Sequence, residues 1–308
     1  MNSRVRILQE ALPVAGTRFT AQCDITRDEI YKRLPFAGKS VERLAGSTVT
    51  IVGVGAGGSL LACQMARAGI GCLRLVDPDS VLAHNVIRHV ANLEDVGRPK
   101  VYVIAEAVLR YNPYICVEAY PIDLFDPESP LDAESVFGGS NLIISATDSV
   151  SAQLQVNAIA WQMGIPGVFG GCFEEARGGE VLFTLPGEGT PCLACLRAGL
   201  ALPETLGQFD YSTATNHEEF KGEPGFAAAV DLVTNIEAQV ALALLLRGTS
   251  SALEEMINPA LNYLLIGGAL GGGYYRFKRP FHIFWQPLAG ARPGCPVCQP
   301  EQIADAQG

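Results

Sequence analysis

The chain has 308 residues, of which 48% are hydrophobic and 18% are charged, and its formal net charge is −10. This size and composition can bury the core of one large α/β domain or of two smaller domains. The acidic balance argues against nucleic acid as a partner. Arg4 near the N-terminus is not followed by a continuous apolar segment, so we predict no signal peptide and expect a cytoplasmic protein.

The first 46 residues carry few periodic signals, and we interpret them as an N-terminal extension. Residues 28–34 could form a short helix, and Val41–Leu44 leads into the first predicted strand. Arg27 and Arg33 are interpreted as solvated surface charges.

A glycine fingerprint organises the next stretch. Thr48–Val52 is a β-branched run short enough for a buried strand, and Leu60–Ala68 is rich in helix formers. Between them Gly53, Gly55 and Gly58 give the pattern G-x-G-x-x-G. A strand, a glycine turn and a helix in this order form the context in which a helix N-terminus binds nucleotide phosphates.

A second apolar run, Leu73–Val76, ends at Asp77, nineteen residues after Gly58. A carboxylate at that point can accept hydrogen bonds from ribose hydroxyls. These features alone predict a nucleotide site of unspecified kind, and a dehydrogenase is one interpretation that they allow.

Several polar side chains that suit phosphate binding follow the second strand. Asn85 and Arg88 are three residues apart and share one face if their segment is helical. Lys100 falls in the first turn of the predicted helix Val101–Tyr111, where the helix dipole disfavours a cation unless an anion is bound nearby. We therefore consider Arg88 and Lys100 as candidate phosphate ligands, with an ordinary exposed lysine as the alternative for Lys100.

Two further strands are predicted at Tyr114–Tyr120 and Asn141–Ala146, and the second ends at Asp148. Ligands bind at the carboxyl ends of strands in open α/β sheets, and a carboxylate there suits the Mg²⁺ carried by a nucleotide. The alternative is that Asp148 caps the predicted helix Ala152–Met163.

The C-terminal half contains a long polar loop and a long apolar helix. The loop, Gly199–Gly225, has no clear periodicity, which is typical of a functional or mobile segment. Helix Phe226–Leu246 is apolar on every side but contains four polar residues, which favours a buried helix over a membrane span and allows a contact with a dimer partner. The other predicted elements are strands at Pro166–Phe169, Glu180–Leu185, Leu261–Ile266, Tyr274–Phe277 and Phe281–Trp285, the last three antiparallel.

Four of the nine cysteines form two pairs, Cys192-Leu-Ala-Cys195 and Cys295-Pro-Val-Cys298. Two such pairs can complete a tetrahedral four-thiolate zinc site, which leaves no open position and is therefore structural. The alternatives are redox dithiols or unrelated surface cysteines. The remaining cysteines are interpreted as inert core residues or left unassigned: Cys63, Cys72 and Cys116 in the first group, Cys23 and Cys172 in the second.

The motifs occur in one order: the glycine fingerprint, Leu-Val-Asp77-Pro-Asp79, Asn85-x-x-Arg88, Lys100, Ala-Thr-Asp148, Pro-Cys-x-x-Cys and a late Cys-x-x-Cys. From about Gly38 to Cys298 this order resembles the adenylating enzymes of the ThiF/MoeB/HesA type, which are related to the ubiquitin-activating enzymes. A dehydrogenase needs neither the Arg88, Lys100 and Asp148 set nor a zinc clip, so the resemblance displaces that interpretation.

The resemblance implies a Rossmann-like α/β fold, with a mostly parallel sheet, helices on both faces, antiparallel C-terminal strands and a zinc clip. The implied domain spans residues 47–298, between the extension 1–46 and a tail 299–308. The implied activity is ATP-dependent adenylation of the C-terminal Gly-Gly carboxylate of a small ubiquitin-like or sulfur-carrier protein by a homodimer, without nucleic acid or a membrane.

The resemblance also implies roles for individual residues. Asp77, with Asp79 nearby, would hold the ribose, and the three glycines of the fingerprint would lie beside the nucleotide. The triphosphate would be held by Asn85, Arg88 and Lys100, and Mg²⁺ by Asp148. The catalytic set is thus Arg88, Lys100 and Asp148, and the implied cofactors are ATP, Mg²⁺ and a structural Zn²⁺.

Three departures from the family pattern leave alternatives open. The family's N-terminal arginine, supplied across a dimer, has no intact motif here, so Arg27 or Arg33 could replace it. The usual Asp-Asn pair is Asp148-Ser149. The loop 199–225 contains no cysteine, which leaves Cys172 as the one candidate for a thioester step. Two other functions also stay open: adenylation of a short peptide or modified nucleoside, and a non-catalytic partner subunit that binds a ubiquitin-like protein.

Overall fold

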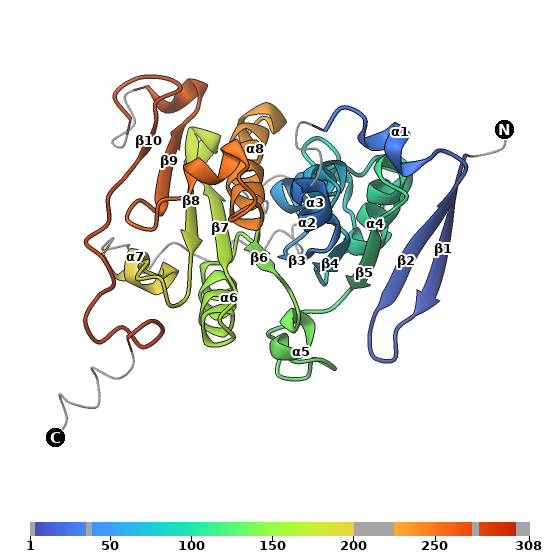
Figure 1. Ribbon diagram of the computed structural model, residues 1–308, viewed down its shortest axis with the longest axis horizontal. Helices are drawn as coiled ribbons and strands as arrows, with labels where there is room; N and C mark the ends of the chain where they lie inside the picture. The colour runs from blue at the N-terminus through green and yellow to red at the C-terminus, as the bar shows by residue number, and fades with distance from the viewer. Residues whose placement is uncertain (1–3, 35–38, 200–224, 273–276, 300–308) are drawn as a thin grey trace.

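The computed structural model describes residues 4–34, 39–199, 225–272 and 277–299. Within these residues ten strands form one sheet in the order β1-β2-β5-β4-β3-β6-β7-β8-β9-β10 (Figure 1). The strands are β1 Val5–Ala11, β2 Thr17–Cys23, β3 Thr48–Val52, β4 Cys72–Val76, β5 Cys116–Tyr120, β6 Leu142–Ser145, β7 Gly167–Cys172, β8 Gly178–Thr184, β9 Tyr263–Gly267 and β10 Ile283–Trp285.

Strands β3 to β7 are parallel and form the centre of the sheet. The order reverses at β3, which pairs with β4 on one side and with β6 on the other. A reversal of this kind opens a crevice at the carboxyl ends of the two neighbouring strands, where open α/β sheets bind ligands. The topology therefore places the candidate site at the ends of β3, β4 and β6.

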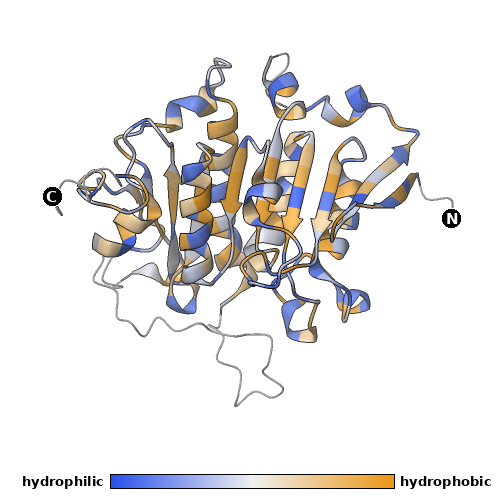
Figure 2. Ribbon diagram, turned by 90° about the horizontal axis from the view of Figure 1, so that it is seen from below, coloured by the Kyte–Doolittle hydropathy of each residue, from blue (hydrophilic) through white to orange (hydrophobic). Residues whose placement is uncertain are grey.

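Helices cover both faces of the sheet, and the central strands between them are predominantly hydrophobic (Figure 2). One face packs against α3, α4 and α8, and the other against α5, α6 and α7. The helices are α1 Arg27–Tyr31, α2 Lys39–Ala45, α3 Ala56–Ala68, α4 Lys100–Tyr111, α5 Ala133–Phe137, α6 Val150–Gln162, α7 Leu193–Gly199 and α8 Ala227–Leu245. The α/β fold class with helices on both faces is confirmed.

The N-terminal extension contains a hairpin that the sequence analysis did not predict. Strands β1 and β2 are antiparallel, and β2 adds to the edge of β5. Arg18 on β2 donates to Glu118 of β5 at 2.7 Å, and Phe19 packs on Tyr102 with 5.5 Å between ring centroids. The sequence does not predict this hairpin, because Phe19 is its one buried residue and the two strands show no alternation of apolar and polar residues.

The antiparallel continuation at the other edge of the sheet is confirmed, with β8, β9 and β10 paired in turn. The predicted strand Tyr274–Phe277 lies outside the described residues except for Phe277, which is buried but is not in a strand. Residues 200–224 of the predicted polar loop also lie outside the described residues.

Two of the cysteines interpreted as inert core residues are placed differently by the structure. Cys72 and Cys116 lie directly opposite each other on β4 and β5, and both are half-buried. These two cysteines are therefore not core residues, whereas Cys63 is buried on α3 as expected.

Helix α8 is long and apolar enough to cross a membrane by length and composition, but it packs against α3, β7 and β8 as a core helix. It carries a buried carboxyl group, Glu237, which is 4% exposed. A Cβ atom at Gly170 of β7 would collide with this carboxyl group, and the Glu237 Oε1 atom has no hydrogen-bond partner among the described residues. Burial raises the pKa of Glu237 to about 8.

We predict that Glu237→Gln removes a pH-dependent loss of stability. The pKa of Glu237 is raised on folding from 4.5 to about 8, so the folded state holds this proton more tightly and stability falls as pH rises through that window. Between pH 5 and pH 8 the fall in the free energy of unfolding should be smaller in the variant by about 2–4 kcal/mol. Urea unfolding at both pH values measures the difference, and parallel curves for the two proteins would contradict the assignment.

Candidate nucleotide site and candidate metal centre

The glycine turn between β3 and α3 is shaped by close packing at two of its glycines. Gly53 has φ +87°, and a Cβ atom there would lie 2.8 Å from the backbone nitrogen of Thr147. A Cβ atom at Gly58 would collide with the Gly53 carbonyl. Gly55, by contrast, has nothing within 4 Å of a Cβ position and begins α3 without a side-chain cap. The turn thus leaves open space in front of the α3 N-terminus, where an anion can approach.

Asp77 and His89 hold this turn at Val54. The Val54 N–H donates to Asp77 Oδ2 at 2.7 Å, and the Val54 carbonyl accepts from His89 Nε2 at 2.7 Å. Because His89 Nδ1 accepts the Ala91 N–H, the ring proton lies on Nε2. Burial lowers the pKa of His89, which keeps the ring neutral and this donor in place.

Lys100 is 8% exposed and belongs to an ion-pair cluster, so the interpretation as an ordinary exposed lysine is wrong. Its Nζ donates to Asp79 Oδ2 at 2.6 Å and lies 3.8 Å from Asp77 Oδ1. Both Asp77 oxygens also accept backbone N–H groups, from Val54 and Asp79. The Asp79 side chain is 44% exposed, so Asp79 rather than Asp77 has carboxylate surface available to a ribose.

Asn85 ends the short helix Ala83–Asn85 that follows β4, and Arg88 lies in the turn after it. Asn85 Oδ1 accepts the Leu82 N–H at 2.8 Å, and the Asn85 carbonyl accepts the Arg88 N–H at 2.9 Å. The Asn85 side chain therefore shapes the turn that presents Arg88. Arg88 is half-buried, and its positive charge opposes the rise in the pKa of the Cys172 thiol at the end of β7.

Asp148 follows β6 at the same edge of the sheet and is exposed. The N-cap of α6 is Ser149 rather than Asp148, because Ser149 Oγ accepts the Ala152 N–H at the start of that helix. The preceding Thr147 lies against Gly53 of the glycine turn. The loop that carries Asp148 is therefore packed on the turn that would hold phosphate.

Cys172 ends β7 near the same edge. Cys172 is an exposed residue, yet desolvation raises the pKa of its thiol to about 12, and the Glu237 carboxyl group acts in the same direction. The raised pKa lowers the thiolate fraction at neutral pH, while the exposure leaves the thiol accessible, so Cys172 stays a candidate nucleophile.

These residues fit the triphosphate of a nucleotide and its metal. An uncapped helix N-terminus and open space at Gly55 favour an anion, and Lys100 and Arg88 supply positive charge in a chain whose net charge is −10. Asp148 offers the exposed carboxylate that Mg²⁺ takes beside phosphate oxygens.

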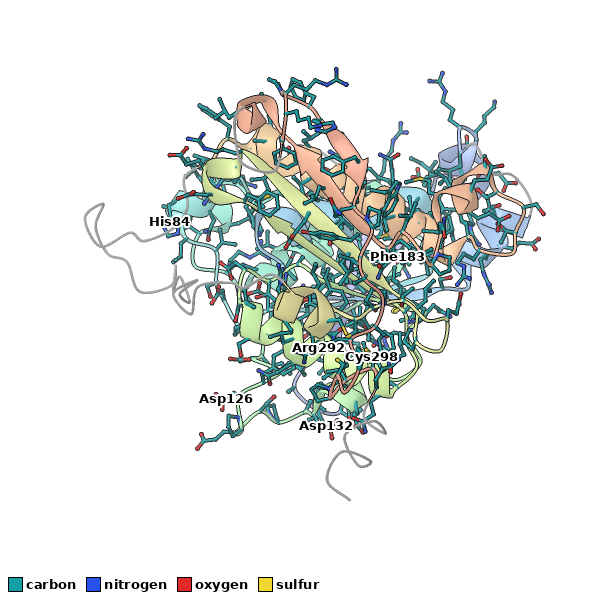
Figure 3. The ribbon with its side chains drawn as sticks, turned by 90° about the vertical axis from the view of Figure 1, so that its left-hand side faces the viewer. His84, Asp126, Asp132, Phe183, Arg292 and Cys298 are labelled. Carbon is teal, nitrogen blue, oxygen red and sulfur yellow. The ribbon has the colours of Figure 1, made fainter. Side chains whose placement is uncertain are left out.

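The four paired cysteines meet beside α7, and Arg292 and Cys298 from the C-terminal segment are labelled there in Figure 3. Sulfur–sulfur distances are 3.9 Å for Cys192–Cys195, 3.7 Å for Cys192–Cys295 and 3.4 Å for Cys195–Cys298. A tetrahedral zinc site with Zn–S bonds of about 2.3 Å has edges of about 3.8 Å, whereas a disulfide bond is about 2.05 Å long. The donor set therefore fits Zn²⁺ better than it fits disulfides.

Sequence reasoning missed two contributors to the nucleotide site. His89 carries no motif, and its role depends on a contact with Val54 that is 35 residues distant in the chain. Gln153 on α6 donates to the carbonyl groups of Thr147 and Gly170 and thereby joins the ends of β6 and β7. A glutamine within a predicted helix does not indicate from the sequence that it bonds to distant backbone carbonyl groups.

Comparison with known proteins identifies relatives along most of the chain. The model of the ThiF family matches residues 31–266. The chain is 34% identical over 168 residues to a sulfur carrier protein adenylyltransferase of Thermus thermophilus, covering 53% of this chain and 60% of that protein. It is 32% identical over 171 residues to the molybdopterin-synthase adenylyltransferase of Escherichia coli, covering 55% and 66%.

A ubiquitin-like modifier-activating enzyme 5 of Drosophila grimshawi is 33% identical over 165 residues, which are 51% of this chain and 41% of that enzyme. The matches thus span less than two thirds of each of these relatives. Among solved structures, E. coli MccB with ATP has a TM-score of 0.60 at 19% identity, over 84% of this chain and 68% of that one. This likeness shows a shared fold.

We predict that the purified protein contains about one equivalent of zinc per chain, held by Cys192, Cys195, Cys295 and Cys298. Cys295→Ser should lower the zinc content well below one equivalent, whereas Cys23→Ser, which changes a half-buried cysteine elsewhere, should leave it unchanged. Elemental analysis of protein purified without added metal decides between these results. Iron in place of zinc, or no metal at all, would show that the assignment is wrong.

Proposed function

This chain belongs to the ThiF family, and on that premise we propose that it activates a carboxylate with ATP. The proposed reaction is adenylation of the C-terminal glycine of a small ubiquitin-like or sulfur-carrier protein, with release of pyrophosphate. The relatives named above are adenylyltransferases and ubiquitin-like activating enzymes, which supports this substrate class.

The observation that carries the proposal is the arrangement of charge at one edge of the sheet. Lys100 and Arg88 approach the carboxyl ends of β3, β4 and β6, and the open N-terminus of α3 lies at the same edge. Asp148 belongs to the loop packed on the glycine turn. Attack of a carboxylate on the α-phosphorus brings two anions together, so a site for this reaction must chiefly neutralise and align charge.

The proposed mechanism needs no general base, because a carboxylate is already ionised at pH 7. The N–H groups of the α3 N-terminus orient the phosphates, and the Asp79 carboxylate binds the ribose hydroxyls. Lys100 and Arg88 stabilise the negative charge that develops on the α-phosphate and on the leaving pyrophosphate. Asp148 would hold Mg²⁺, which when bound would supply positive charge to the phosphate oxygens.

We further propose that the protein works as a cytoplasmic homodimer. In the family an N-terminal arginine is supplied across the dimer, and Arg27 or Arg33 of the partner copy could take that place. Arg27 lies at the start of α1, where its guanidinium stacks on the Tyr31 ring at 5.3 Å, and Arg33 is exposed at the end of the same segment. Both stay candidates for this role.

Charge-removing variants test the proposed chemistry. Arg88→Ala, Lys100→Ala and Asp148→Ala should each slow ATP–pyrophosphate exchange by on the order of 10²-fold or more, because each removes a group that stabilises charge in the transition state. Arg110→Ala removes an exposed charge from the last turn of α4 and serves as the control that should keep full activity.

The measurement is exchange of labelled pyrophosphate into ATP in the presence of a Gly-Gly-ended carrier protein. All four variants should fold, which circular dichroism can check. If Asp148→Ala exchanges at the wild-type rate, the proposed role of that residue is wrong.

Cys172→Ala distinguishes adenylation alone from adenylation followed by thioester formation. Because the thiol of Cys172 has a pKa of about 12, we expect exchange to survive this substitution nearly unchanged and no thiol-sensitive adduct to form in the wild-type protein. Mass spectrometry of the protein incubated with ATP and carrier detects such an adduct. An adduct in the wild-type protein that is lost in Cys172→Ala would establish the covalent step.

A further inference from the structure

A single buried amide joins the loop that carries Asp148 to the neighbouring strand. Gln153 lies in the second turn of α6 and is 4% exposed. Its Nε2 atom donates to the carbonyl of Thr147 at 3.1 Å and to the carbonyl of Gly170 at 2.9 Å. Thr147 directly precedes Asp148, and Gly170 belongs to β7. Both amide hydrogens of Gln153 are therefore used at the carboxyl ends of β6 and β7.

Arg197 on α7 reinforces the orientation of this amide. With Nε2 bound to the two carbonyl groups, Oε1 points to the guanidinium of Arg197, whose Nη2 lies 3.5 Å away. This contact is long for a hydrogen bond, but a cation attracts the amide oxygen in a buried setting. A reversed amide would direct its NH₂ group at the guanidinium and its oxygen at two carbonyl oxygens, so the carbonyl groups and Arg197 favour the same orientation.

Arg197 is itself fixed. Its Nη1 donates to Glu180 Oε1 at 2.6 Å, and the Glu180 side chain, 6% exposed, also accepts the hydroxyl group of Tyr263. The ion pair holds the guanidinium against β8. One terminal nitrogen of the Arg197 guanidinium thus binds Glu180 on β8, and the other lies beside the Gln153 amide.

Helix α7 connects this network to the metal centre. Arg197 follows Cys195 by two residues on α7, which begins directly after Cys192. The same helix is joined to α6 a second time, because the Leu193 N–H donates to Asn157 Oδ1 at 3.0 Å. The position of α7, and with it the position of the guanidinium, depends on how the two Cys-x-x-Cys pairs are held together.

We propose that Gln153 and Arg197 are positioning residues through which the cysteine clip sets the place of Asp148, and thereby the affinity of the nucleotide site for Mg²⁺. The proposal rests on the role of Asp148 in the proposed function. The four cysteines would then do more than stabilise the fold. If α7 were displaced, Arg197 would no longer hold the Gln153 amide, and the loop that carries Asp148 would be released.

The test measures Mg²⁺-dependent binding of α,β-methylene ATP by titration calorimetry, which does not require turnover. Gln153→Leu keeps the packing volume and removes the amide, and Arg197→Lys keeps the charge beside Glu180 but loses the planar fork that reaches Gln153. Each substitution should raise the Mg²⁺ concentration for half-maximal binding about tenfold, the effect of losing one hydrogen bond of ~1.4 kcal/mol.

Leu154→Ala is the matched control. Leu154 is the next residue of α6 and packs into the hydrophobic core, so its truncation costs stability without touching the amide. Its melting temperature should fall at least as far as that of Gln153→Leu, while its Mg²⁺ dependence stays that of the wild type. An equal shift in Leu154→Ala would show that general destabilisation explains the effect, and would overturn the proposal.

Removal of the metal from the clip by a chelator gives the second measurement, made at a temperature at which the protein stays folded. Chelation before the Mg²⁺ titration should weaken Mg²⁺ binding in the wild type but add little in Gln153→Leu, because both changes interrupt the same connection. If chelation and Gln153→Leu weaken Mg²⁺ binding additively, the proposed connection from the four cysteines through Arg197 and Gln153 to Asp148, called the relay below, is wrong.

The proposal and the proposed function fail in different ways. Normal Mg²⁺-dependent nucleotide binding without pyrophosphate exchange would refute the adenylation chemistry and leave the relay standing. Normal exchange with an unchanged Mg²⁺ dependence in Gln153→Leu would refute the relay alone. A wild-type protein that binds no nucleotide at any Mg²⁺ concentration would refute both.

Discussion

The candidate site depends on the two hydrogen bonds that hold Val54. Asp77 takes its N–H and His89 binds its carbonyl group, so the glycine turn is fixed from β4 and from the segment after it. The burial of Asp77 is tolerable because backbone donors and the nearby Lys100 ammonium compensate its charge. With the turn in this position, Gly55 faces open space and the α3 N-terminus is exposed to an anion. The favourable position for an anion at the α3 N-terminus therefore depends on the two hydrogen bonds to Val54.

The same constraint explains how an acidic protein can bind a polyanion. The net charge of −10 is that of the whole chain, while Lys100 lies beside Asp77 and Asp79 at the end of β4, next to the point where the strand order reverses. Lys100 is oriented by Asp79, so its charge is partly compensated until a ligand draws the ammonium group away. Local geometry therefore outweighs net charge in deciding what this edge can bind.

The sequence predicts best where local chemistry demands particular residues. The β-branched run before Gly53 and the Leu-Ile-Ile run before Asp148 are parallel strands, and the two Cys-x-x-Cys pairs meet as their spacing requires. Prediction fails where a role depends on distant partners. The β1–β2 hairpin has a single buried residue to mark it, and the pairing of Cys72 with Cys116 follows from strand order.

Pyrophosphate exchange with two versions of one carrier would show whether this chain adenylates a C-terminal glycine. We expect that a ubiquitin-like or sulfur-carrier protein ending in Gly-Gly supports Mg²⁺-dependent exchange, and that the same protein without its last glycine does not, because the reacting carboxylate then stops short of the site. Adenylation of a C-terminal glycine is refuted if the wild-type chain binds ATP and exchanges no pyrophosphate with any Gly-Gly-ended carrier, or if it exchanges equally well with the shortened one.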